Sequence, residues 1–226
     1  MSKDIKQLRN LYFEFESFLK KIHGFYLDSL IASEFLLKHI DKEQDYIKEL
    51  FKDDDHINIF GKPIWDAHNF SHEWMLSIFG KSSQGKSYAG SGMYRTTLGE
   101  MKDRNKPDGP NCLYLGNMCV VMLYSYWEHY LRKSLTKAMG LTKSIHRPVW
   151  GDLRILRNIL LHNKGKANST IKNMEVFNWY QPGDTITIGQ EKFRDVIFAL
   201  RVFCNWLHHE SFPSHSLKIP LQKHKA

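Results

Sequence analysis

The sequence predicts a mainly α protein: a helical bundle with a small β-hairpin before its last helix and an irregular insertion at about residues 56–111. Apolar residues recur every three or four positions over the long segments outside that insertion. The 226 residues are 42% hydrophobic and 25% charged, a balance that supports a packed core. This length allows one domain or two small ones, and we expect a single domain over residues 1–226.

The first helix is expected over residues 4–40, with Asp4 or Ser2 as its cap. A second, short helix is expected over residues 42–52, where Asp53-Asp54-Asp55 ends it. One apolar stripe runs along the first helix at spacings of three and four, formed by Ile5, Leu8, Tyr12, Phe15, Leu19, Ile22, Tyr26 and Leu30.

The insertion at 56–111 is rich in Gly, Ser, Asn and Pro, which favours irregular structure. A short helix is expected near Glu73–Phe79, although Trp74–Phe79 is also acceptable as a strand. The run Lys106-Pro-Asp-Gly-Pro110 is a strong turn signal and ends the insertion.

Two core helices are expected next. The first spans residues 112–139 with Gly140 as its stop, and its first half is apolar almost all round. The second spans residues 149–164, with Asp152 in its first turn and Gly165 just beyond its end.

A β-hairpin is expected over residues 173–189, with a turn at Gln181-Pro-Gly-Asp184 followed by the alternating residues Thr185–Ile188. A last amphipathic helix follows over residues 190–209. We expect residues 211–226 to form a loose, basic tail.

The segment Arg157-Asn-Ile-Leu-Leu-His162-Asn-Lys-Gly165 carries the clearest chemical signal. Arginine pairs with phosphate through two parallel hydrogen bonds, and histidine exchanges protons near neutral pH. The bare spacing is weak evidence, because Arg201 and His208 match it too. Context favours Arg157, since Asn158 and His162 are four residues apart and share a helix face on which they could hydrogen-bond.

This segment resembles the signature of the HEPN superfamily, all-helical domains found in RNase toxins and anti-phage defence proteins. The upstream run Tyr126-Trp-Glu128-His-Tyr-Leu-Arg-Lys is similar to the helix that precedes the motif in that family. The expected hairpin ending in Pro182-Gly183-Asp184 also resembles a common decoration before the family's last helix. The resemblance covers about residues 112–210 and leaves out the insertion.

The resemblance implies a metal-independent endoribonuclease in which the ribose 2′-OH attacks the adjacent phosphorus. His162 would be the general base or acid, and Arg157 would stabilise charge on the phosphoryl oxygens. Asn158 would orient the histidine or contact phosphate, and Glu128 would hold Arg157. Further RNA contacts are expected from Arg154, Asn163, Lys164 and Lys166.

The expected partners are RNA, a second copy of the chain, and an antitoxin or defence protein. The net charge of +8 favours an anionic partner such as RNA. Arg157 and His162 lie about 140° apart around the helix and about 7.5 Å apart along it, so a homodimer would join them more easily than one chain. The three cysteines lack a CxxC pair and fit a cytoplasmic protein, and no membrane span is expected.

Other readings stay open. A non-catalytic module that binds RNA or protein is the main alternative. The run Gly80-Lys-Ser-Ser-Gln-Gly-Lys86-Ser87 matches a phosphate-binding loop, which would need a preceding strand and a following helix. His68 and His72 lack a third ligand for zinc, so no cofactor or metal is expected. Tyr124, Trp127 and Tyr130 can stack on bases, but on a core helix packing is the simpler role.

Overall fold

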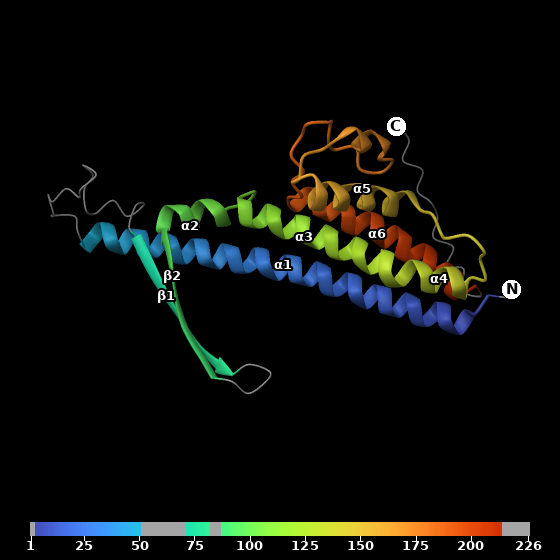
Figure 1. The fold of residues 1–226 in the computed structure, drawn as a ribbon, viewed down its shortest axis with the longest axis horizontal. Coiled ribbons are helices and arrows are strands. Elements are labelled where there is room, and N and C mark those ends of the chain that lie inside the picture. The colour runs from blue at the N-terminus through green and yellow to red at the C-terminus, as the bar shows by residue number, and fades with distance from the viewer. Residues whose placement is uncertain (1–2, 51–70, 82–86, 214–226) are drawn as a thin grey trace. The chain divides into compact units, whose positions relative to one another are not determined.

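The computed structural model describes residues 3–50, 71–81 and 87–213, with the backbone alone for residues 71–81 and 87–95. It is mainly helical, as predicted (Figure 1). The chain forms two compact units. One comprises the described parts of Met1–Asp28 and Leu113–Ala226, and the other comprises the described parts of Ser29–Cys112.

The first helix, α1 (Ile5–Leu50), is continuous, so the prediction of separate helices at 4–40 and 42–52 is wrong. No glycine or proline interrupts the sequence between residues 38 and 50, and good helix formers fill it. Asp4 does cap the helix, because its Oδ1 accepts a hydrogen bond of 3.0 Å from the Gln7 backbone N–H.

The predicted irregular insertion contains regular elements. Strands β1 (Ser71–Lys81) and β2 (Ser87–Thr97) pair in antiparallel register, with Met75 opposite Met93, and α2 (Leu98–Asn105) follows. The expected helix near Glu73–Phe79 is therefore a strand. The composition of the segment did not indicate strands, because the first half of β2 contains Ser87, Gly90, Ser91 and Gly92, which are poor strand formers.

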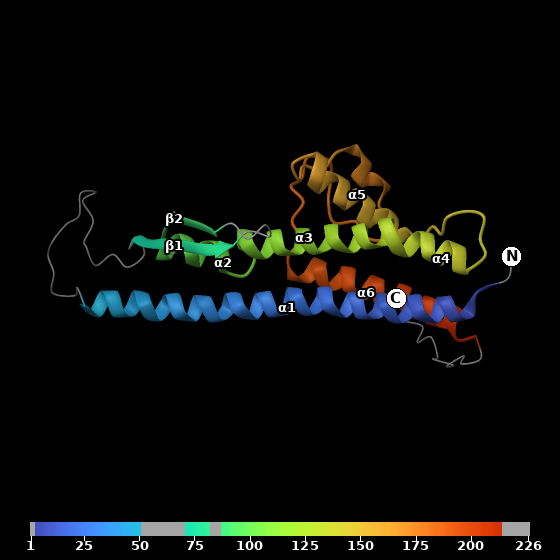
Figure 2. The ribbon, with the colours of Figure 1, turned by 60° about the horizontal axis from the view of Figure 1, so that its bottom comes forward.

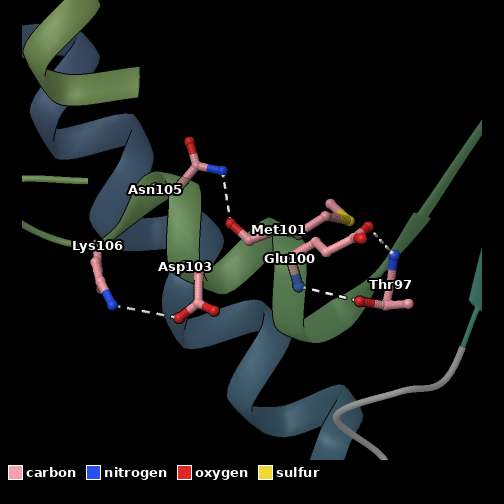
Figure 3. Close-up of polar contacts among 6 residues, drawn as sticks. All are labelled: Thr97, Glu100, Met101, Asp103, Asn105 and Lys106. Carbon is pink, nitrogen blue, oxygen red and sulfur yellow. Dashed lines mark hydrogen bonds and ion pairs between the residues drawn. The ribbon is translucent and has the colours of Figure 1, made fainter. Parts of the chain in front are cut away.

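Helix α2 begins with a capping box (Figure 3). The Thr97 hydroxyl oxygen accepts the Glu100 backbone N–H at 3.1 Å, while Glu100 Oε2 accepts the Thr97 N–H at 3.0 Å. The motif Thr97-x-x-Glu100 is readable in the sequence and signals this helix start. A small core of Ile40, Ile47 and Leu98 joins α2 to the second half of α1.

In the unit that contains Leu113–Ala226, α3 (Pro110–Tyr126, of which residues 110–112 belong to the other unit) and α4 (Arg132–Ala138) form one run with a π-helical turn, η1 (Trp127–Leu131), between them. The run confirms the helix predicted at 112–139, and it ends at Gly140, whose φ is 66°. Helices α5 (Pro148–His162) and α6 (Gln190–Ser211) confirm the other two (Figure 2).

Aromatic side chains hold these helices together. Trp127 of η1 and Trp150 of α5 stack with ring centroids 4.4 Å apart and planes 2° apart. Phe203 of α6 meets both rings edge-on, and Phe15 of α1 contacts Trp150 and Phe203 in the same way. Such pairs contribute about 0.5–1.5 kcal/mol each beyond the area they bury. Trp127 and Tyr124 are therefore core residues, whereas Tyr130 is exposed.

The hairpin predicted at 173–189 does not form. A 3-10 helix, η2 (Ser169–Asn173), precedes an irregular segment, and residues 183–186 pair instead with the chain just after α5. Ala167 N–H donates to the Asp184 carbonyl at 2.8 Å, and Ile186 N–H donates to the Gly165 carbonyl at 2.8 Å. Thr185 and Ile186, the first two of the alternating residues 185–188, thus pair with residues 165 and 166 instead of with residues 174–180.

Candidate functional site

Helix α5 carries the predicted Arg–His segment, and local signals fix its ends. Pro148 occupies the first turn, where its missing N–H costs nothing. At the other end, Lys164 and Gly165 adopt left-handed conformations with φ of 53° and 73°. Gly165 N–H then donates to the Ile159 carbonyl at 3.2 Å. His162 is the last helical residue, and its side chain is exposed.

A polar groove of about 550 Å³ runs beside α5. One wall is the α5 face that carries Arg154, Asn158 and His162 at spacings of four residues. The other wall is the segment around η2, which lies next to α5 in Figures 1 and 2. The residues that line the groove are His146, Gly151, Asp152, Arg154, Ile155, Asn158, Ile159, His162, Asn163, Asn168, Thr170, Asn173 and Glu175.

Arg157 does not line this groove. Its Nη1 donates to Asn158 Oδ1 at 2.9 Å, and its Nε is buried without a hydrogen-bond partner in the described part of the chain. The expected hydrogen bond between Asn158 and His162 is therefore replaced by one between Asn158 and Arg157. Asn158 therefore binds Arg157 and also belongs to the groove lining that includes His162.

Glu128 does not hold Arg157 as predicted: no ion pair joins them among the described residues. Its Oε1 instead accepts a hydrogen bond of 3.2 Å from the Tyr124 hydroxyl. Burial raises the pKa of Tyr124, and the Glu128 carboxylate raises it further. The Arg132 and Arg154 guanidiniums act in the opposite direction on the same pKa. Glu128 is thus a hydrogen-bond partner of Tyr124 and not of Arg157.

The other predicted RNA-binding residues separate into two groups. Arg154 and Asn163 line the groove. Lys164 and Lys166 are exposed in the turn after α5 but do not line it, and Lys166 forms an isolated β-bridge with Thr185. The two lysines therefore follow His162 in the chain without being part of the groove lining.

Asp152 has a role that its position in the sequence did not reveal. The residue is 1% exposed, and its carboxylate accepts the backbone N–H groups of Glu175, Val176 and Phe177 at 2.8–2.9 Å. The prediction assigned it only to the first turn of a helix. It fastens the second wall of the groove to α5, and the sequence offers no signal for this because the partners are backbone groups.

The phosphate-binding loop considered for residues 80–87 lacks the following helix that such a loop needs. Strand β1 does precede the loop, but strand β2 follows it from Ser87 onward, where such a loop needs a helix. Residues 82–86 of that motif, like His68 and the tail beyond Pro213, lie outside the described residues. His72 lies in β1.

Within residues 3–50, 71–81 and 87–213, no group of three or more His, Cys, Asp or Glu side chains is placed to hold a metal ion. The same part of the chain contains no helix that combines the length and apolarity needed to cross a membrane.

Comparisons of the chain with protein-family models, with curated proteins and with solved structures give no match.

Proposed function

We propose that this protein is a metal-independent endoribonuclease of the HEPN type, acting as a toxin or anti-phage defence effector. The observation that carries the proposal is the groove itself, where an imidazole, an amide and a guanidinium from His162, Asn158 and Arg154 line one face of α5. The net charge of +8 favours an RNA partner, and the resemblance of the Arg157–Gly165 segment supplies the reaction class.

The proposed reaction is an internal transfer. The ribose 2′-oxygen forms a bond to the adjacent phosphorus, and the bond from phosphorus to the 5′-oxygen breaks. The proton that leaves the 2′-OH ends on the 5′-oxygen, and His162, exposed on the groove, moves it. Arg157 stabilises the charge that develops on the phosphoryl oxygens. The products are a 2′,3′-cyclic phosphate and a free 5′-OH.

The proposed active species is a homodimer. Within one chain, His162 lines the groove and Arg157 does not, which supports a site that a second copy completes. A twofold axis beside α5 would bring the Arg157 of one copy near the His162 of the other. An antitoxin or defence partner remains part of the proposal through the resemblance alone.

The test is cleavage of single-stranded RNA by the purified chain in excess EDTA. We expect fragments with 2′,3′-cyclic phosphate ends, and we expect His162→Ala to abolish cleavage. His129→Ala is the matched control, because His129 is an exposed histidine of η1 outside the groove. A strict magnesium requirement, or full activity in His162→Ala, would refute this mechanism.

A non-catalytic RNA-binding module is the second candidate. It is favoured by the position of Arg157, which is paired with Asn158 and lies outside the groove. This candidate predicts that the chain binds RNA without cutting it and that His162→Ala leaves the folded protein intact.

A further inference from the structure

The two walls of the groove differ in charge. The α5 wall carries Arg154 and His162 with Asn158 between them, and its one carboxylate, Asp152, is buried and bound to three backbone N–H groups. The opposite wall, formed by Asn168, Thr170, Asn173 and Glu175, contributes no cation and one carboxylate to the lining. An anion in the groove would therefore be attracted to Arg154 and repelled by Glu175, which favours placing a polyanion against α5.

The α5 wall suits the backbone of a strand that lies along the helix. Residues four apart on one helix face are about 6 Å apart along the axis, so Arg154, Asn158 and His162 form an evenly spaced column. Phosphates along a nucleic acid strand repeat as well, and contacts to them position the strand without reading its sequence.

The opposite wall suits base edges. The Asn168 oxygen is occupied by the Thr170 backbone N–H at 3.0 Å and by its hydroxyl, which fixes the start of η2. Among the described residues, no hydrogen bond or ion pair engages the side chains of Asn173 and Glu175. The Glu175 backbone is nevertheless held in place, because its N–H donates to Asp152 at 2.9 Å.

The chemistry of Glu175 limits which base it accepts. An ionised carboxylate accepts hydrogen bonds and donates none, so it pairs with an exocyclic amino group, such as N4 of cytosine or N6 of adenine. Uracil offers carbonyl oxygens in place of that amino group, and these oxygens would face the carboxylate unfavourably. The amide of Asn173, two residues earlier, matches adenine through two hydrogen bonds.

We propose that Asn173 and Glu175 form a base-reading wall, which selects an adenine or cytosine of single-stranded RNA over uracil while the phosphates lie against α5. The proposal rests on the proposed function, since it assigns the specificity of that same groove. Asp152 is a positioning residue for this wall, because it fixes the backbone from which Glu175 projects.

The test uses His162→Ala protein, so that the RNA stays intact, and short single-stranded oligomers of A, C and U read by fluorescence anisotropy. We expect U oligomers to bind about tenfold more weakly than the better of A and C. Adding Glu175→Gln should bring this ratio close to one, because glutamine also donates to the uracil oxygens. The slope of log affinity against log salt should change little with this substitution.

Two matched variants separate base reading from charge. Glu191→Gln removes an exposed carboxylate from α6 outside the groove and should leave the ratio unchanged. Arg154→Ala should weaken A, C and U binding by a similar factor and lower the salt slope by about one. Thermal melting of each variant checks that the fold is intact.

The outcomes test the base-reading wall separately from the proposed nuclease activity. Equal binding of A, C and U, or a ratio that Glu175→Gln leaves unchanged, overturns the base-reading wall even if the wild-type chain cleaves RNA. Base preference without cleavage overturns the nuclease and supports the wall. A chain that binds no RNA overturns both.

Discussion

The carboxylate of Asp152 and the backbone N–H of Phe177 lie 2.8 Å apart, although 25 residues separate them in the sequence. The same carboxylate accepts two further N–H groups, from Glu175 and Val176. A buried anion is tolerated here because three donors replace its water. This contact joins the segment after η2 to α5 and so builds the groove.

Asp152→Asn should therefore be strongly destabilising. The amide NH₂ would face backbone donors in place of one acceptor oxygen, and the remaining hydrogen bonds would lose their charge. We expect the free energy of unfolding to fall by about 3 kcal/mol, measured by urea denaturation. Asp195→Asn, an exposed carboxylate of α6, is the control and should stay within about 0.5 kcal/mol of the parent. An equal, small effect of both substitutions would contradict this role of Asp152.

Gly116→Ala should also destabilise the protein. A Cβ at this position of α3 would lie 1.9 Å from the Ile188 carbonyl oxygen, and the clash is with backbone rather than with a flexible side chain. We expect a loss of about 2 kcal/mol or more. Gly24→Ala in α1 meets no atom within 4 Å and should instead stabilise the helix by up to about 1 kcal/mol. Thermal melts of the two variants should shift in opposite directions.

Asn158 should affect turnover through Arg157. Removing its oxygen in Asn158→Ala releases the Arg157 guanidinium, and we expect kcat for RNA cleavage to fall about tenfold. Asn158→Asp keeps an acceptor for Arg157 but adds negative charge to the groove, so kcat should recover while KM rises. Equal loss of kcat in both variants would show that holding Arg157 is not the role of this side chain.

Glu100 should have a pKa below that of an ordinary glutamate. The hydrogen bond from the Thr97 N–H, followed by that from the Thr96 hydroxyl, lowers the pKa of its carboxyl below the ordinary 4.5. Since the folded pKa is below the unfolded one, the capping box stabilises α2 above the unfolded pKa. That contribution is lost as the pH falls through the folded pKa. NMR titration of the Glu100 carboxyl checks this, and Thr96→Val should raise the value. A pKa of 4.5 or higher in the parent protein would contradict the capping box.

Several elements could be read from the sequence because their signals are local. The spacing of apolar residues placed the helices, Pro148 and Gly165 bounded α5, and Asp4 capped α1. The Arg157–His162 segment was likewise placed on one helix correctly. Helix periodicity and capping depend on residues within about four positions of each other, and such relations are visible in a linear sequence.

The misplaced strands show the limit of that approach. Residues 185–188 have the alternation of a strand, but alternation does not show which segment of the chain will pair with them. The segment 165–167 took the pairing that the prediction gave to residues 174–180. In β1 and β2, glycine and serine lowered the local preference for a strand, and pairing along an eleven-residue register compensated for it.

The sequence by itself determined that the protein is mainly helical and that an arginine, an amide and a histidine share one helix. Only the tertiary structure decided that Arg157 turns to Asn158, that Arg154 and His162 line a groove, and that Glu175 faces them from its other wall. The physical reason is that side-chain direction around a helix is set locally, whereas the partner across a groove is set by long-range packing. Here the buried Asp152 fixes that partner through backbone groups, which every residue type other than proline possesses.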